Sequence, residues 1–375
     1  MQKNKKKIKV IIITCMVLII LAVTLPLLLS IYIYQSIFGN RYETSAYRAR
    51  NINEFDNLKG ERYVFKSNDG QNLIGYKYFK EPKTVKGIVI IAHGLGGGGH
   101  NSCMDVADYL ATNGYIVFAY DATGNDESEG NSVRGFPQGL IDLDYAIRFI
   151  KNSTEFEGLP IVLFGYSWGA YSVGNVLNIH PDIKAIVMVA GINKSSDIIE
   201  EQGKKMMGEG IKFLMPYISL IEKNKFGKYS SYSSIDGFET SNAGIMLIHG
   251  TDDDTISFEN NFLKFYDLFN KNPRFVFVGL EGRGHNYVYH SDFSKIYREE
   301  YDQKFAEYVE STGAEINAEL KLKHMNENGN KSMLFELDTE LMDRIVLFYD
   351  GYAKGGPSGV DEYFEKPEDF FSAPL

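Results

Sequence analysis

A serine near the middle of the chain stands in a pattern that suits nucleophilic chemistry. The apolar run Ile161 to Phe164 leads directly into the sequence GYSWG, in which the serine is Ser167, and a stretch of helical character follows. A G-x-S-x-G sequence has little weight by itself, but between a buried strand and a helix it predicts a sharp turn that exposes the serine hydroxyl. The two glycines allow strand and helix to approach closely. Ser167 is therefore the candidate nucleophile.

Two later segments carry the partners that such a serine needs. A serine hydroxyl is a weak nucleophile unless an imidazole accepts its proton and an acid orients that imidazole. Three adjacent acids, Asp252, Asp253 and Asp254, follow one apolar run, and His285 closes the sequence GRGH after another. The chain order Ser, Asp, His is typical of α/β sheets that carry a serine triad. His285 is the candidate base, and one of the three aspartates is the candidate acid.

A glycine-rich turn offers a place for the negative charge of the reaction. The sequence HGLGGGG, residues 93–99, follows the apolar run Gly87 to Ala92. Such a turn can direct a backbone N–H toward the developing oxyanion. We expect the N–H groups of Leu95 and Trp168 to be the donors. A phosphate-binding turn is the alternative, but no Lys-Ser/Thr pair follows the glycines.

In this order, the motifs resemble those of α/β-hydrolases in the group that contains monoacylglycerol lipases, serine aminopeptidases and related bacterial esterases. The resemblance covers roughly residues 62–309. The family's H-G-x-x-D-x-x-V pattern begins at His249 and selects Asp253 as the acid, and its glycine-histidine pair ends at His285. The resemblance therefore implies a triad of Ser167, Asp253 and His285 on an α/β-hydrolase fold.

One family motif is only partly present, and several residues have other interpretations. The D-x-R-G-x-G-x-S-x-G pattern begins at Asp121, but Thr123 and Asp126 replace its Arg and its second Gly. His93 and His249 lie beside glycines, which favours a role in stabilising turns. His290 is an alternative to His285 as base, although no glycine precedes it.

Short apolar runs alternate with helical intervals along the chain. This alternation predicts a doubly wound, mostly parallel sheet whose strands and helices position these motifs. Asn68-Asp69-Gly70 predicts a hairpin turn between the first two strands. The expected strands are residues 62–66, 72–79, 87–92, 115–120, 161–164, 185–190, 245–248 and 275–278. The expected helices are residues 103–113, 136–151, 167–179, 258–270, 292–311 and a last one at 338–349.

The alternation stops between residues 191 and 241, where a Met-rich amphipathic stretch predicts an inserted helical cap. Its apolar stripe suits either core packing or a gate above the site. We expect a hydrolase domain over residues 62–350, with a polar insertion at about 312–335, a linker at 37–61 and a C-terminal tail at 351–375.

Composition excludes several classes of function. The formal net charge is −10, although five lysines lie within the first ten residues, so nucleic acid is not an expected partner. The acidic balance also disfavours strongly anionic substrates. The two cysteines, Cys15 and Cys103, provide neither a disulfide framework nor a cysteine metal site.

The amino terminus predicts a membrane anchor. An apolar run from Ile8 to Tyr34 follows the lysine cluster and is long enough to span a bilayer as a helix. A cleaved signal peptide is the alternative, but its apolar part is shorter and ends in a small-residue site. We expect residues 1–36 to form a cytoplasmic tip and a single-pass anchor, with the catalytic domain outside the cell.

Together these features predict a serine hydrolase that cleaves carboxylic esters through an acyl-serine, without metal or cofactor. The alternatives are a serine aminopeptidase that acts on short peptides and a non-catalytic surface binding protein with the same fold. The expected partners are a small ester or peptide and the membrane.

Overall fold

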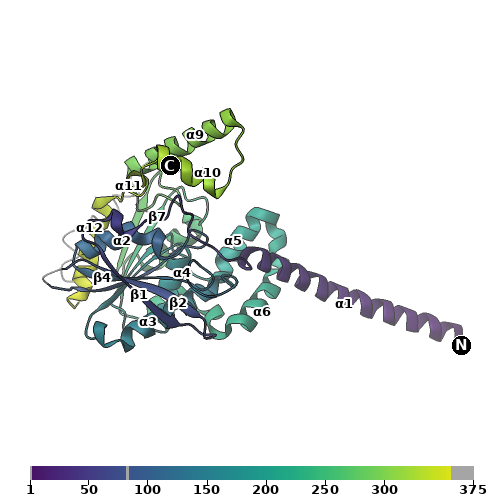
Figure 1. Ribbon diagram of the computed structural model, residues 1–375. Helices are drawn as coiled ribbons and strands as arrows, with labels where there is room; N and C mark the ends of the chain where they lie inside the picture. Colours follow the sequence, from purple (N-terminus) through teal and green to yellow (C-terminus); the bar gives the residue numbers. More distant parts are fainter. Residues whose placement is uncertain (1, 82–83, 356–375) are drawn as a thin grey trace.

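The computed structural model describes residues 2–81 and 84–355. Its body is an eight-stranded sheet in the order β1-β2-β4-β3-β5-β6-β7-β8. Figure 1 shows the sheet inside the body, with helices around it. The strands β3 to β8 are parallel, whereas β2 pairs antiparallel with both β1 and β4. The strand bounds are β1 Lys59–Lys66, β2 Asn72–Phe79, β3 Gly87–Ala92, β4 Tyr115–Asp121, β5 Ile161–Tyr166, β6 Ala185–Val189, β7 Gly244–Gly250 and β8 Phe275–Leu280.

Helices cover both faces of the sheet, because successive side chains of a buried strand point to opposite sides. In β3, Ile88 and Ile90 pack into one apolar core with α3 (Phe136–Asn152) and α4 (Trp168–Asn175). Val89 and Ile91 pack into the other core with α2 (Met104–Thr112) and α12 (Thr339–Ala353). The expected doubly wound sheet is confirmed, and the last helix packs on the sheet as expected.

In the chain, the cap follows β6 and precedes β7. It consists of α5 (Ser195–Met207), the 3₁₀ turn Gly208–Phe213, α6 (Met215–Phe226), the 3₁₀ turn Gly227–Ser231 and α7 (Ser234–Thr240). Figure 1 shows its helices α5 and α6 beside the body end of α1 (Gln2–Phe38). The expected helix at 258–270 begins as a π-helix, Phe258–Leu263, and continues as α8, Lys264–Phe269.

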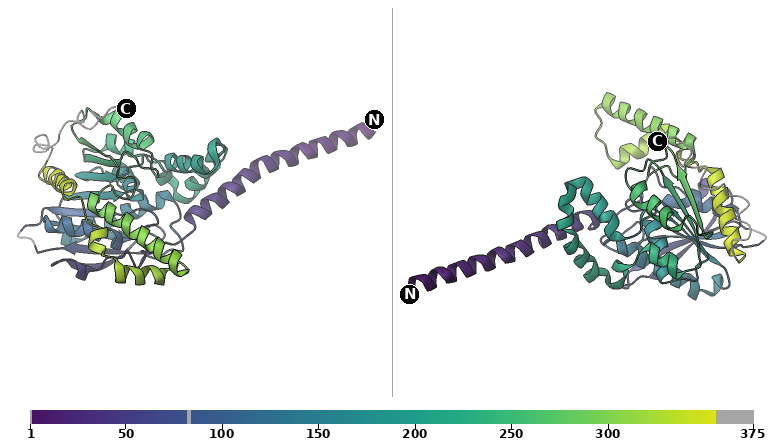
Figure 2. Two further views of the ribbon diagram at one scale, coloured as in Figure 1. Left: turned by 90° about the horizontal axis from the view of Figure 1, so that it is seen from above. Right: turned by 180° about the vertical axis from the view of Figure 1, so that it is seen from behind.

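The polar insertion is helical and stands at the edge of the body (Figures 1 and 2). It follows α9 (Asp292–Thr312) and contains α10 (Ala318–Asn328) and α11 (Lys331–Leu334). Tyr301, Met325 and Leu334 form a small apolar cluster that joins α9, α10 and α11.

The first helix, α1 (Gln2–Phe38), projects far from the body (Figures 1 and 2). Its segment Lys6–Phe38 is long and apolar enough to cross a membrane. Its last turns lie on the body instead. Tyr34 and Phe38 are each 3% exposed, and the Tyr34 hydroxyl donates a hydrogen bond to Glu222 of α6 at 3.0 Å.

The stretch that we expected to be a linker, residues 37–61, packs against the domain. The backbone N–H of Tyr42 donates to the Gly124 carbonyl, and the N–H of Asp126 donates to the Tyr42 carbonyl. Arg50 is buried and forms ion pairs with Glu54 and Asp105. This packing was not predicted because the backbone pairing at Tyr42 and the buried ion pair between Arg50 and Asp105 join residues far apart in the chain, which composition does not show. Of the expected tail, residues 356–375 lie outside the described residues.

Candidate active site

Ser167 occupies a strained turn between β5 and α4. Its backbone has φ 55° and ψ −111°, a conformation that L-residues rarely adopt. The flanking glycines make the turn possible: a Cβ at Gly165 would lie 2.3 Å from the Gly169 carbonyl oxygen, and one at Gly169 would lie 1.9 Å from that of Ala92. This is the geometry expected of a nucleophile elbow.

The structure brings His285 and Asp253 to this serine from two different loops. His285 Nε2 lies 3.2 Å from Ser167 Oγ, and His285 Nδ1 lies 2.8 Å from Asp253 Oδ2. The loops follow β8 and β7, so both residues reach the carboxyl edge of the sheet, where open α/β sheets place their sites. The Asp253 contact orients the ring so that Nε2 faces the hydroxyl.

The other two aspartates have different partners. Asp252 accepts a hydrogen bond from the Gly284 N–H at 2.9 Å, and Asp254 from the Thr255 hydroxyl at 3.2 Å. Asp253 Oδ1 also accepts from the N–H groups of Thr255 and Ile256, each at 2.8 Å. Asp253 is therefore the aspartate positioned toward the imidazole.

The charge of Asp253 is strongly favoured. Burial alone would raise its pKa, but hydrogen bonds with His249 and His285 and with the Ile256 N–H hold the pKa of Asp253 well below its usual range. His249 Nε2 lies 3.4 Å from Asp253 Oδ2 and 2.9 Å from the Ile256 carbonyl oxygen. His249 thus supports the acid and the turn that carries it.

Two residues that the sequence did not single out hold the loop of His285. The Tyr166 hydroxyl donates to the His285 carbonyl at 3.0 Å, and the two rings lie 5.2 Å apart. Arg283 donates to the His290 carbonyl and to Asp338. Tyr166 is the variable residue before the serine in GYSWG, so its position was available from the motif, but its contact was not.

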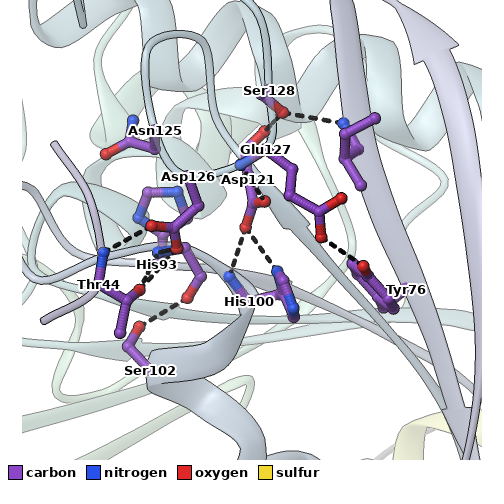
Figure 3. Close-up of polar contacts among 12 residues, drawn as sticks. Thr44, Tyr76, His93, His100, Ser102, Asp121, Asn125, Asp126, Glu127 and Ser128 are labelled. Carbon is purple, nitrogen blue, oxygen red and sulfur yellow. Dashed lines mark hydrogen bonds and ion pairs between the residues drawn. The ribbon is translucent and has the colours of Figure 1, made fainter. Parts of the chain in front are cut away.

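The glycine turn after β3 is fixed by a network of polar side chains (Figure 3). Asp126 accepts hydrogen bonds from the backbone N–H and the hydroxyl of Thr44 and from the Gly99 N–H at 2.8 Å. Asp121 accepts from the N–H and the Nδ1 of His100, both at 2.7 Å. A Cβ at Gly99 would lie 1.9 Å from Asp121 Oδ1. Asp126, which departs from the family's glycine, is thus an anchor of this turn.

The expected oxyanion donors flank Ser167. Leu95 lines both cavities that contain Ser167 and His285. Trp168 is the first residue of α4, where backbone N–H groups lack intrahelical acceptors and the helix dipole favours negative charge. This placement fits the expected oxyanion site.

The remaining histidines have structural contacts. His93 Nδ1 pairs with the Gly94 carbonyl at 2.8 Å, and its Nε2 accepts from the Ala122 N–H at 3.0 Å. Burial lowers the pKa of His93. Burial, followed by the nearby Arg298, lowers the pKa of His290 to about 3. His285, rather than His290, is the imidazole hydrogen-bonded to Ser167.

An apolar cavity of about 620 Å³ opens on one side of Ser167. Its walls come from the end of α1, from the cap and from Phe136. We call this the apolar cavity; its residues from α1 and the cap are Ile33, Ile37, Phe38, Ile198, Ile199, Gln202, Gly203, Met206, Met207, Ile211 and Ile218.

A smaller polar cavity of about 180 Å³ lies on another side of Ser167. We call it the polar cavity, and Arg48, Arg50, Arg298, Asn101 and Asn286 are among its lining residues. Burial and the positive charge of Arg48 lower the pKa of Arg298. Three arginines thus line this cavity despite the acidic composition of the chain, and one of them, Arg50, is paired with Glu54 and Asp105.

The sheet order and the strained serine turn define the α/β-hydrolase fold. Residues 83–236 match the sequence model of the family described as serine aminopeptidase, S33. A monoglyceride lipase homolog of monkeypox virus is 30% identical over 95 residues, which are 25% of this chain and 34% of the relative, so the chain spans about a third of that relative's length. These two matches confirm the resemblance to the group of monoacylglycerol lipases and serine aminopeptidases.

Solved structures similar to this chain include an esterase from Pyrococcus furiosus, with 18% identity, a TM-score of 0.48 and coverage of 68% of this chain and 93% of that chain. Est1E from Butyrivibrio proteoclasticus, solved with ferulic acid, has 18% identity and a TM-score of 0.47 and covers 71% of this chain and 98% of that chain.

Proposed function

We propose that this protein is a serine hydrolase that cleaves carboxylic esters through an acyl-serine intermediate. The observation that carries the proposal is the contact chain from Asp253 through His285 to Ser167 on a strained turn beside an apolar cavity. These are the relations that acyl transfer requires of nucleophile, base and orienting acid.

In the proposed mechanism, Ser167 Oγ attacks the ester carbonyl carbon while His285 Nε2 accepts the hydroxyl proton. The N–H groups of Leu95 and Trp168 stabilise the oxyanion. The tetrahedral intermediate collapses, and His285 returns the proton to the departing alkoxide. Water then attacks the acyl-serine by the same route, which releases the carboxylic acid. Asp253 stays ionised and stabilises the imidazolium.

We further propose that the acyl group occupies the apolar cavity and the leaving alcohol the polar cavity. Apolar chains gain free energy when they leave water, so the cavity walled by α1 and the cap suits the acyl group. The arginines and amides of the other cavity suit oxygen-rich leaving groups.

The second candidate is a serine aminopeptidase, which the family description favours. A free amino terminus is a cation and is best bound by a carboxylate. Among the described residues that line either cavity none is acidic, and three are arginines. The local charge therefore favours esters over peptides with free amino termini.

Substrate panels separate these candidates. We expect purified full-length protein to hydrolyse p-nitrophenyl esters with kcat/KM well above that for aminoacyl p-nitroanilides. Faster cleavage of any aminoacyl anilide than of every ester would favour the peptidase. The Ser167→Ala variant controls for contaminating hydrolases.

We also propose that α1 anchors the protein in the cell membrane with the catalytic domain outside. The apolar helix Lys6–Phe38 and the lysines before it support this orientation. Protease added to intact cells should digest the domain, and complete protection until lysis would refute the orientation.

A further inference from the structure

The end of α1 is part of the wall of the apolar cavity. Ile33, Ile37 and Phe38 face the same cavity as Ser167 and His285. A helix that served only as a membrane tether would not be expected to line the cavity beside the proposed triad. The helix that is apolar enough to cross a bilayer thus forms part of the cavity that contains the proposed nucleophile.

The contact between α1 and the body is specific. Ser30, Tyr34 and Phe38 recur at helical spacing and are 0%, 3% and 3% exposed. Tyr34 bonds to Glu222, which also accepts a hydrogen bond from Ser195 of α5 at 2.7 Å. A Cβ at Gly135 would lie 1.9 Å from the Tyr34 hydroxyl, so a residue without a side chain makes room for the helix.

The backbone at the end of α1 is also joined to the body. The N–H of Arg134 donates to the Phe38 carbonyl at 3.1 Å, and the N–H of Val133 donates to the Asn40 carbonyl at 3.0 Å. No flexible linker therefore separates the helix from the cavity.

The remainder of α1 has the length of a bilayer core. Residues 8–29 are apolar apart from Lys9, Thr14 and Thr24, and residues 8–25 are exposed along their whole length. At 1.5 Å per residue the segment 8–29 is about 33 Å long, close to the thickness of about 30 Å that the hydrocarbon core has. The cavity would then lie at the membrane surface.

The cap beside α1 exposes further apolar side chains. Met206 and Phe213 are 75% and 81% exposed, and Met207, which lines the cavity with Met206, is 40% exposed. Figure 1 shows α5 and α6 at the base of α1. Exposed methionine and phenylalanine side chains suit contact with lipid.

We propose that the substrate is an ester of the surrounding bilayer, whose acyl chain passes along α1 into the apolar cavity without crossing water. This proposal rests on the proposed ester hydrolysis at Ser167. Each methylene group lowers the equilibrium constant for transfer of an acyl chain from the bilayer into water about fourfold. A cavity wall that is continuous with the bilayer would let the chain enter without this transfer. Because Ser167, the proposed nucleophile, lines the same cavity, the chain that enters it would be the acyl part of an ester.

Cross-linking locates the chain directly. Full-length protein in phosphatidylcholine nanodiscs is treated with a fluorophosphonate whose alkyl chain ends in a diazirine, and is then irradiated and digested. We expect phosphonylation of Ser167 and cross-links to residues 33–38 of α1. Cross-links to the cap or the polar cavity without any to α1 would overturn the inference. Failure to phosphonylate Ser167 would instead overturn the proposed function.

A matched pair of variants tests the wall by kinetics. Ile37→Trp narrows the cavity from α1, whereas Ile31→Trp changes the exposed face of the same helix. In Ile37→Trp we expect the ratio of kcat/KM for p-nitrophenyl decanoate to that for the acetate to fall about tenfold, since roughly two methylene contacts are lost. Ile31→Trp should leave the ratio unchanged. Equal ratios in both variants and in the unchanged protein would contradict the inference.

Discussion

The two cavities that meet at Ser167 differ in what lines them and in where their walls come from in the sequence. The apolar cavity is built by α1 and the cap, which lie more than a hundred residues apart in the chain. The polar cavity takes Arg48 and Arg50 from the stretch after α1 and Arg298 from α9. Both cavities contain Ser167 and His285 of the proposed triad, which we call the floor. The floor lies in turns at the carboxyl edge of the sheet, whereas the walls come from segments that are attached to the sheet.

The largest expected effect concerns the shared floor. Asp253→Asn disturbs the imidazole that serves both cavities, and the equivalent change in the triad of a serine protease lowers kcat by about 10⁴. Asp252→Asn and Asp254→Asn are matched controls, because their side chains bond elsewhere. Steady-state kinetics with one ester should give the large loss only for Asp253→Asn. A comparable loss for a neighbour would reassign the acid.

The next largest effect concerns chain-length selectivity, which should depend on the apolar cavity and not on the triad. Along p-nitrophenyl esters from acetyl to decanoyl, we expect kcat/KM to rise by up to about fourfold per methylene until the cavity is filled. Met207→Trp reduces the space, so the maximum should move to a shorter chain. Leu220→Trp, on an exposed position of α6 that is not among the cavity residues, is the control. If the chain length of maximal kcat/KM were unchanged in Met207→Trp, the cap would not be part of the site that binds the acyl group.

A smaller effect concerns the polar cavity. Arg48 is exposed, so Arg48→Gln should keep the fold while removing one positive charge. We expect kcat/KM for butyryl esters of 4-hydroxybenzenesulfonate to fall about fivefold relative to that for p-nitrophenyl butyrate, as for a partly exposed ion pair. Lys184→Gln is the control on an exposed site elsewhere. An equal loss for both esters would show that Arg48 does not select the leaving group.

How much could be predicted from the sequence differs between floor and walls. Strands β2 and β3 have the predicted bounds, since their apolar runs end at clear turns. Ser167, Asp253 and His285 lie in short motifs, and the structure brings them together as expected. Their catalytic role stays a prediction. In short motifs of this kind, the local sequence largely determines the geometry of the turn, so the position of the side chain can be predicted.

The walls were predicted only in part. The cap was expected as a possible gate above the site, and its residues line the apolar cavity. The contributions of α1 and of the stretch after it were not predicted, because their residues look alike in sequence whether they face lipid, water or protein. Ile33 and Ile37 continue an apolar run, and only the spacing of Ser30, Tyr34 and Phe38 hints at a face packed on the body. Arg48 lies in a stretch that composition marks as a linker. Its place beside Ser167 depends on long-range backbone pairing at Tyr42.

The smallest effect tests how α1 is held to the cap. Burial raises the pKa of Glu222 from 4.5 to about 7, so the stability that its protonated form contributes is present below about pH 4.5 and is lost as pH rises through about 7. The unfolding temperature of the full-length protein in detergent should therefore fall from pH 5 to pH 8. Glu222→Gln should reduce that fall by a few degrees, on the order of 1 kcal/mol, whereas Glu239→Gln, an exposed acid on α7, should not. An identical fall in all three proteins would show that Glu222 does not titrate in this range.

Trapping the covalent intermediate tests the central claim most directly. Turnover of p-nitrophenyl decanoate by the full-length protein is quenched with acid within one cycle, and the peptides are analysed by mass spectrometry. We expect a decanoyl group on Ser167 and none in the Ser167→Ala variant. Release of p-nitrophenol with the acyl group on another residue, or no release and no adduct at all, as in a non-catalytic binding protein, would contradict the proposed acyl-serine mechanism.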